Sequence, residues 1–286
     1  GNMMRTLIFG SKGQLGRDLQ QVFSRRGETI GYDLPELDVS NNALVRAVVT
    51  DFQPDAIINA AAYTQVDHAE DDREGAFRAN EEGARVVAAA AAAQECPVVY
   101  YSTDYVFDGT ATTPYEPDTP ECPLGVYGAS KAAGEAATRA ETAGKHIILR
   151  TAWLYGPGGS NFVEKILSAA HARPELKVVD DEMGSPTHTL DLAWATEAAL
   201  AEKAYGTHHA VNSGWCTRFA FAKAIIEMAG LDTRVTPCKS TEFETKAERP
   251  AYSVLSTRTL EEATGHKMRA WQDALRDYME RRSTHS

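Results

Sequence analysis

A glycine-rich turn near the start of the chain, Gly10-Ser-Lys-Gly13-Gln-Leu-Gly16, constrains the fold more than any other feature. It follows the apolar run Thr6-Leu-Ile-Phe9 and opens a helical pattern over 14–26. Glycines in this setting let the backbone approach a pyrophosphate, and a helix N-terminus stabilises the ligand's negative charge. The pattern therefore predicts a dinucleotide-binding turn with cofactor contacts from Gly10, Gly13, Gln14, Leu15 and Gly16.

Strand and helix patterns alternate through the first half of the chain. Apolar runs predict strands at 29–33, 56–59, 98–102 and 146–150. Helical patterns between them cover 43–52, 76–93 and a segment that opens near Tyr127. Strands that are apolar along most of their length indicate a parallel sheet covered on both faces. We therefore predict an α/β fold, a Rossmann-type doubly wound parallel sheet with a smaller C-terminal substrate-binding region.

The regular alternation weakens after residue 150. Helices are predicted at 161–170, 191–203, 219–229 and 270–282, with short strands at 177–179 and 208–211. We expect residues 1–152 to form an NAD(P)-binding domain and 153–286 to bind mainly substrate. Elements at about 190–212 are expected to return to the main sheet. Four prolines predict that residues 108–123 form a surface loop beside the mouth of the active site.

Charge and cysteine usage exclude several classes of partner. The net charge of −11 argues against binding to nucleic acid or to an anionic membrane, both of which need a basic surface. Four cysteines without a regular spacing predict neither a zinc site nor a disulfide framework, and we assign no metal. With no long apolar span and no signal peptide before the first strand, the sequence predicts a cytoplasmic protein with reduced thiols.

Tyr127 and Lys131 are four residues apart in a predicted helix and therefore share one face. A phenol transfers a proton poorly at neutral pH unless its anion is stabilised, which a neighbouring ammonium does by lowering the pKa. Ser102 and Thr103 end a predicted strand, where side chains alternate, so only one of them can face a ligand. We interpret this set as a hydride-transfer site in which Lys131 lowers the pKa of Tyr127.

Two segments after strands are candidates for further cofactor contacts. Asp33 ends the second predicted strand, where a carboxylate accepts hydrogen bonds from the adenosine ribose and favours NADH. Lys12 and Arg5 favour instead the 2′-phosphate of NADPH, so either cofactor is expected. After the third strand, the small side chains of Ala60, Ala61 and Ala62, followed by Tyr63, would let the dinucleotide lie against the backbone; packing alone is the alternative for the alanines.

Asp38 and Val39 precede the second predicted helix and have two interpretations. They would lie beside the adenine of the cofactor, or Asp38 would serve, with Ser40, in helix capping.

Several motifs in the same order resemble those of dTDP-4-dehydrorhamnose reductases, a family of extended short-chain dehydrogenases. The run Ser102-Thr-Asp-Tyr-Val-Phe-Asp-Gly109 is the most specific of them. The others are Gly10–Gly16, Asn59–Thr64 with Val66–Asp67, Tyr127–Lys131 with Gly134–Glu135, Arg150–Gly156, Asn161–Phe162, Gly184–Thr187 and Arg249–Pro250.

The resemblance implies a role for each residue of the catalytic set. Thr103 would hydrogen-bond the C4 carbonyl of a dTDP-linked 4-keto-6-deoxy sugar, and Tyr127 would protonate that oxygen. Lys131 would bind the nicotinamide ribose, and NADPH or NADH would deliver the hydride. The product would be dTDP-L-rhamnose, and a homodimer is a possible assembly.

The resemblance also implies a set of substrate contacts. Asp104 and Tyr105 would touch the sugar, and Trp153 would pack over the hexose or the base. Arg249 would bind the diphosphate. The alternatives are a core position for Trp153 and a surface salt bridge for Arg249.

Asp181-Glu182-Met183 departs from the family pattern, in which an amide stands at the Glu182 position. This leaves another dTDP-4-keto-6-deoxyhexose open as the substrate. A dehydratase or epimerase would need a second carboxylate after Asp104, where this chain has Tyr105. A noncatalytic regulatory subunit of methionine adenosyltransferase would not need the tyrosine and lysine pair.

Overall fold

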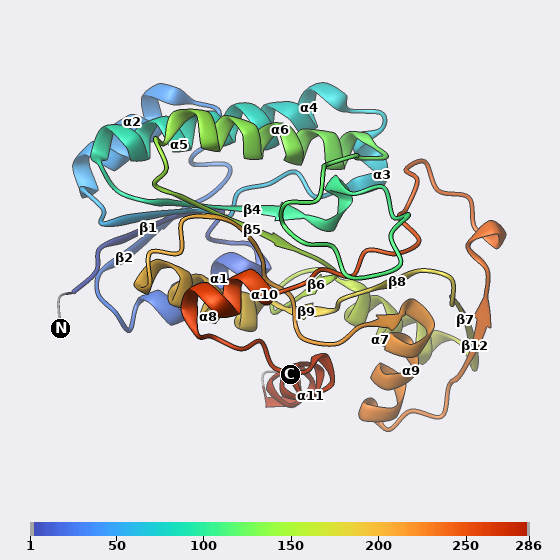
Figure 1. Ribbon diagram of the computed structural model, residues 1–286. Helices are drawn as coiled ribbons and strands as arrows, with labels where there is room; N and C mark the ends of the chain where they lie inside the picture. The colour runs from blue at the N-terminus through green and yellow to red at the C-terminus, as the bar shows by residue number, and fades with distance from the viewer. Residues whose placement is uncertain (1–2, 285–286) are drawn as a thin grey trace.

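The computed structural model describes residues 3–284 and is built around a six-stranded sheet (Figure 1). The strand order is β10-β5-β4-β3-β1-β2, and every neighbouring pair is parallel. The strands are β1 (Thr6–Phe9), β2 (Thr29–Tyr32), β3 (Ala56–Asn59), β4 (Val98–Thr103), β5 (His146–Thr151) and β10 (Gly206–His209). The predicted doubly wound parallel sheet is confirmed.

Helices cover both faces of this sheet (Figure 1). One face carries α2 (Asn42–Phe52), α3 (Val66–Ala69), α4 (Arg73–Phe77), α5 (Gly83–Gln94) and α6 (Val126–Glu141). The other carries α1 (Gln14–Phe23), α8 (Thr189–Ala201) and α10 (Arg258–Thr264). No helix within residues 3–284 has the length and apolar character that a bilayer span requires.

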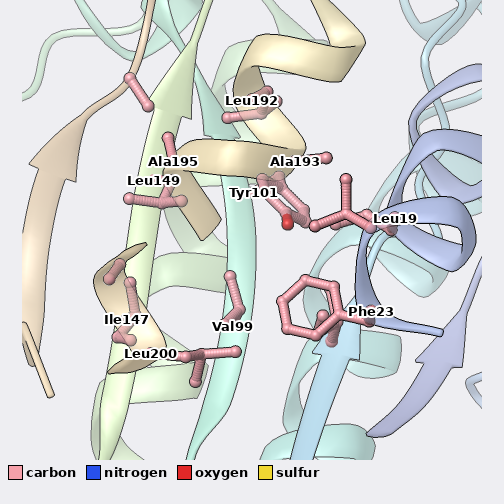
Figure 2. Close-up of a cluster of buried hydrophobic side chains, with 14 of the residues drawn as sticks. Leu19, Phe23, Val99, Tyr101, Ile147, Leu149, Leu192, Ala193, Ala195 and Leu200 are labelled. Atoms are coloured by element: carbon pink, nitrogen blue, oxygen red, sulfur yellow. The ribbon is translucent and has the colours of Figure 1, made fainter. Parts of the chain in front are cut away.

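Buried side chains of α1 and α8 pack against those of β4 and β5 in one hydrophobic core (Figure 2). Phe23 of α1 and Leu192 of α8 are fully buried against Val99, Ile147 and Leu149 of these strands. Burial of each such side chain contributes about 1.5–3 kcal/mol to folding. β10 is an edge strand of the main sheet, and α8 packs on one face of it. Part of the second half of the chain therefore belongs to the main sheet and its helical cover.

The rest of the second half forms a smaller helical region beside the sheet (Figure 1). Its core is aromatic and centres on the buried Phe221. Its helices are α7 (Phe162–Ala172), α9 (Arg218–Ala229) and α11 (Trp271–Thr284). Three two-stranded pairs complete it: β7 (Glu175–Val179) with β12 (Arg234–Cys238), β8 (Met183–Gly184) with β11 (Cys216–Thr217), and β6 (Leu154–Tyr155) with β9 (Thr187–His188).

The long helix expected at 76–93 is interrupted, which corrects the sequence prediction. A π-helical turn, η1 (Arg78–Glu82), separates α4 from α5. It contains the buried Asn80, whose amide donates to the Tyr63 carbonyl and to the Ser130 hydroxyl, each at 3.0 Å. Asn80 thereby joins α6 to the segment after β3, a use typical of π-turns near functional sites.

Residues 108–123 include more buried structure than the surface loop that was predicted. Tyr115 is buried and stacks on Phe107 at 4.4 Å between ring centroids. Its backbone forms a bridge with Leu255. Two short 3₁₀ turns complete the chain, η2 (Asp104–Val106) and η3 (Ser240–Glu242).

A buried ion pair joins β5 to α6. The Arg150 guanidinium donates to both carboxylate oxygens of Glu135, at 2.9 and 2.8 Å, and both side chains are almost completely buried. Arg150 also donates to Glu121 at 2.8 Å and to the Pro117 carbonyl at 3.1 Å. The pair therefore fixes α6 against the sheet and holds the proline-rich loop over it.

Removing one member of this pair should destabilise the fold strongly. Arg150→Met leaves the buried Glu135 carboxylate with only the partly exposed Arg139 as an ion-pair partner, and we expect a loss of about 3–5 kcal/mol in the free energy of unfolding. Denaturant unfolding measures it. The exposed pair of Arg276 with Asp273 is the control, and Arg276→Met should leave the unfolding midpoint unchanged. Equal effects of the two variants would contradict this account.

Candidate active site

The glycine-rich turn lies against the backbone that follows β3. Gly10 has a φ of +80°, and a Cβ there would lie 2.5 Å from the Ala60 carbonyl carbon and the Ala61 nitrogen. A Cβ on Gly16 would lie 2.2 Å from the Gly10 carbonyl oxygen. The structure thus brings together the turn and the alanine segment at the carboxyl edge of the sheet, and both glycines are required for this close approach.

The first turn of α1 supplies backbone donors rather than side chains to this edge. Gln14 and Leu15 are its first residues, whose N–H groups have no partner within a helix. The Gln14 side chain instead accepts from the Gly156 N–H at 3.1 Å and from the Asn161 amide at 2.9 Å. Leu15 packs against the core. These backbone donors fit a pyrophosphate, as the sequence predicts.

Asp33 binds the turn itself, with a 2.9 Å hydrogen bond from the Lys12 N–H to its carboxylate. The ammonium of Lys12 pairs with Glu36 at 3.0 Å, and Arg5 pairs with Glu28. Both cations proposed for a 2′-phosphate therefore already have carboxylate partners.

Asp38 accepts from the Ser40 N–H at 2.9 Å and from the Ser40 hydroxyl at 2.8 Å. The cap of α2 is Asn41, which accepts from the Leu44 N–H at 3.1 Å. The local bonds of Asp38 thus match the second interpretation in part. Val39 is buried beneath α5.

Ala62 is exposed at the same edge, whereas Tyr63 is held more firmly. The N–H of Tyr63 donates to the Asn80 side chain at 2.9 Å. Its ring stacks on His68.

Thr103 and Tyr127 come together at the end of β4 and the start of α6. The Thr103 hydroxyl lies beside the Tyr127 phenol and lowers its pKa, and it donates to the Asp104 carboxylate at 3.1 Å. The ring of Tyr105 lies edge-on to that of Tyr127, with centroids 5.5 Å apart. Ser102 faces away, beside Glu135. Strand alternation thus places Thr103, and not Ser102, next to the phenol.

The sequence predicted a lowered pKa for Tyr127, and the structure shows a raised one. Burial raises the pKa of Tyr127 well above its ordinary value, although the neighbouring Thr103 hydroxyl opposes the rise. The Lys131 ammonium lies 4.4 Å from the centre of the Tyr100 ring, and burial lowers its pKa to about 7 against the opposing charge of Glu135. Desolvation is the largest cause of both shifts.

Asp104 is almost fully buried beside the reacting hydroxyls. Burial raises its pKa to about 6, opposed by the neighbouring hydroxyls of Ser253 and Thr103. Its second carboxylate oxygen has no hydrogen-bond partner within residues 3–284. Burial likewise raises the pKa of Tyr105 to about 12. Both predicted sugar contacts therefore line the site.

Trp153 lies between the sheet and the smaller region. Its ring packs over Gly184, where a Cβ would lie 2.6 Å from it, and stacks on Phe221 with centroids 6.3 Å apart. The guanidinium of Arg218 covers the ring at 3.7 Å from its centroid. Trp153 is therefore partly a core residue, the alternative that the sequence left open.

Arg249 has a carboxylate partner. Its two terminal nitrogens donate to the two oxygens of Asp67 at 3.0 and 2.8 Å. This is the salt-bridge alternative, and the fork proposed for a diphosphate is occupied.

Sequence reasoning missed Arg218, Asn80 and Ser253. Arg218 offered a weak signal, because a cation at the first position of a helix opposes the helix dipole. Asn80 and Ser253 come from segments whose contacts with the site depend on tertiary structure, and no local pattern indicates them.

The raised pKa of Asp104 predicts a specific pH dependence of stability. Between the unfolded value near 4 and the folded value of about 6, the native state binds more protons, so its stability falls as the pH rises through this window. Asp104→Asn should remove this loss, which is at most about 3 kcal/mol. Denaturant unfolding of both proteins at pH 4.5, 5.5 and 7 tests it; parallel pH profiles would contradict the assignment.

Two glycine variants should separate fold from cofactor binding. Gly13→Ala introduces a Cβ whose nearest contact is 3.6 Å away, so we expect an unchanged melting temperature with weaker NADPH binding. Gly16→Ala should lower both, because its Cβ meets the Gly10 carbonyl. Thermal unfolding and calorimetric titration measure the two effects. Full NADPH affinity in both variants would place the cofactor elsewhere.

Comparisons with known proteins agree with this geometry. The RmlD substrate binding domain family model matches residues 4–284. The spore coat polysaccharide biosynthesis protein SpsK of Bacillus subtilis (strain 168) is 42% identical over 283 residues, 99% of each chain. The dTDP-4-dehydrorhamnose reductase of Burkholderia thailandensis is 37% identical over 95% of this chain and 97% of its own.

A solved structure shows the same fold. The dTDP-4-dehydrorhamnose reductase of Bacillus anthracis str. Ames, in complex with NADP, superposes with a TM-score of 0.95 at 37% identity, covering 98% of this chain and 100% of that one. Together with the match over residues 4–284, this shows that the chain belongs to the RmlD substrate binding domain family.

Proposed function

We propose that the protein reduces the C4 ketone of dTDP-4-dehydro-L-rhamnose with NAD(P)H and forms dTDP-L-rhamnose. The observation that carries the proposal is the position of the Thr103 and Tyr127 hydroxyls beside each other at the carboxyl end of β4, on the sheet edge that also holds the glycine-rich turn. The two reductases that resemble this chain over nearly its whole length are named for the same reaction.

The reaction needs a hydride at C4 and a proton on the carbonyl oxygen. The cofactor, when bound, supplies the hydride. The Thr103 hydroxyl and the Tyr127 phenol bind the carbonyl oxygen, and the phenol then donates its proton to it. Because burial raises the pKa of Tyr127, its donor form is fully populated at neutral pH.

Lys131 has two roles in this proposal. Its ammonium binds the nicotinamide ribose and stabilises the Tyr127 phenolate that remains after proton transfer. A pKa lowered by burial to about 7 makes the charge of Lys131 sensitive to any further negative group that comes near it.

The cofactor is NADPH or NADH, and it lies between the turn, Asp33 and the Ala60–Ala62 backbone. We assign the cofactor-binding domain to residues 1–152 and most of the substrate contacts to 153–286. The sugar lies between Asp104, Tyr105 and Trp153. The substrate is a small dTDP-linked sugar, and neither nucleic acid nor a membrane is needed.

A second candidate substrate is another dTDP-4-keto-6-deoxyhexose. The observation that favours it is Glu182, a carboxyl group whose pKa is raised by burial and lowered by Arg218 and Arg249. An acid in place of an amide changes which sugar hydroxyls or base atoms this part of the site binds. The reaction at C4 is the same for both candidates.

Tyr127→Phe tests the proposal. With dTDP-4-dehydro-L-rhamnose generated in place by the upstream enzymes, we expect NADPH and NADH oxidation by the wild type and a kcat lower by about 10²–10⁴ in the variant. The affinity for NADPH should change little.

Tyr101→Phe is the matched control, since it removes a buried phenol from β4, the strand that ends in Thr103, at a position that faces Thr196 of α8. It should retain kcat. Turnover retained in Tyr127→Phe would move the proton donor to another residue.

A further inference from the structure

Arg218 places an unpaired positive charge beside the proposed active site. It is the first residue of α9, and its guanidinium lies 3.7 Å from the centre of the Trp153 ring and 4.9 Å from that of Phe162. Among residues 3–284, no hydrogen bond or ion pair of this guanidinium is present. An arginine remains charged at neutral pH. Among residues 3–284, this charge therefore has no carboxylate within ion-pair distance.

The carboxyl groups of Glu182 and Asp104 attract the Arg218 cation, but its place in the helix and its burial oppose it. The N-terminus of a helix is the end that the dipole makes unfavourable for positive charge. Burial also opposes the charge and lowers the pKa of Arg218. The cation–π contact with Trp153 stabilises the folded protein by only about 0.5–2 kcal/mol. By contrast, Arg150 and Arg249 each have a carboxylate within 3 Å.

The charge of Arg218 acts on two carboxyl groups of the proposed active site. It lowers the pKa of Asp104 and of Glu182 against the larger effect of burial. Its backbone N–H donates to the Glu182 carbonyl at 3.2 Å. The Arg218 guanidinium lies over Trp153, which comes two residues after the end of β5. The last residue of β5, Thr151, pairs with Thr103. Arg218 therefore lies near the reacting hydroxyls without contacting them.

The chemistry of a stacked guanidinium selects its ligand. With one face on Trp153, the N–H donors at the edge remain, and they form a planar fork that fits phosphate oxygens. The fork of Arg249, the residue that the sequence suggested, is already occupied by Asp67.

We propose that Arg218 binds the diphosphate of the nucleotide-linked substrate and is the residue that sets the affinity for it, in place of Arg249. This proposal rests on the proposed function in taking the substrate to be a nucleotide-diphosphate sugar. Glu182, the carboxyl group next to Arg218, opposes the anion and limits that affinity.

Calorimetric titration of dTDP into the NADPH-bound protein tests the proposal. We expect Arg218→Met to weaken dTDP binding about ten- to a hundredfold, since a hydrogen bond to a charged group is lost. Arg218→Lys should recover part of the loss because it keeps the charge without the fork. Arg249→Met should weaken binding much less.

Glu182→Gln gives a test of opposite sign. Removing a negative charge near the bound diphosphate should tighten dTDP binding severalfold. NADPH affinity should be unchanged in the Glu182 and Arg218 variants. A merely structural role for Arg218 would not produce effects of opposite sign at the two positions.

Each outcome separates this inference from the proposed function. Undiminished dTDP affinity in Arg218→Met, or no dTDP binding by the wild type, would overturn the role of Arg218. If dTDP binds in an Arg218-dependent manner and the wild type does not reduce dTDP-4-dehydro-L-rhamnose, the proposed substrate is wrong and the diphosphate site stands.

Discussion

The buried ion pair between Arg150 and Glu135 is the interaction on which the site depends. Each charge relies on the other in the interior, with Arg139 as a further partner of Glu135 and Glu121 as a further partner of Arg150. The pair therefore holds α6 in one rotation and height against β5. Because β4 is the neighbouring strand, this fixes Tyr127 opposite Thr103. Glu135 also keeps the pKa of the buried Lys131 from falling further. One pair therefore stabilises the fold and sets the charge balance of the site.

Desolvation is the dominant electrostatic effect around the reacting groups. It raises the pKa of Tyr127 and of Asp104 and lowers that of Lys131. All three shifts favour the neutral form, as expected where water is excluded. For a reductase this is useful, because the proton donor is kept protonated and a carbonyl oxygen that gains charge meets hydrogen-bond donors that face little competition from water.

The substrate side of the site is assembled from segments far apart in sequence. Arg249 reaches back to Asp67, 182 residues earlier, and the Arg218 guanidinium covers Trp153. These contacts leave one guanidinium paired and the other unpaired. The assignment of the diphosphate to Arg218 follows from that difference, which depends on the packing of the smaller region against the sheet.

The sequence alone predicted the sheet and the glycine-rich turn, and it indicated Thr103 and Tyr127 as the candidate catalytic pair. Apolar strands separated by helical patterns are local, and the need for Gly10 and Gly16 follows from backbone sterics at a strand-to-helix turn. Strand alternation showed that only one of Ser102 and Thr103 could face a ligand, and the resemblance to the reductase family favoured Thr103. These inferences hold because each depends on neighbours within a few residues.

Only the tertiary structure determined the pKa values and the ion-pair partners of the charged residues around the site. The spacing of Tyr127 and Lys131 predicted a shared face, but burial and the position of Tyr100 set their pKa values. The sequence likewise did not show that the π-helical turn η1 interrupts the expected helix, or that Asp67 pairs with the guanidinium of Arg249. The energy of a charge depends on the depth and partners that the whole fold gives it, and no local pattern contains that information.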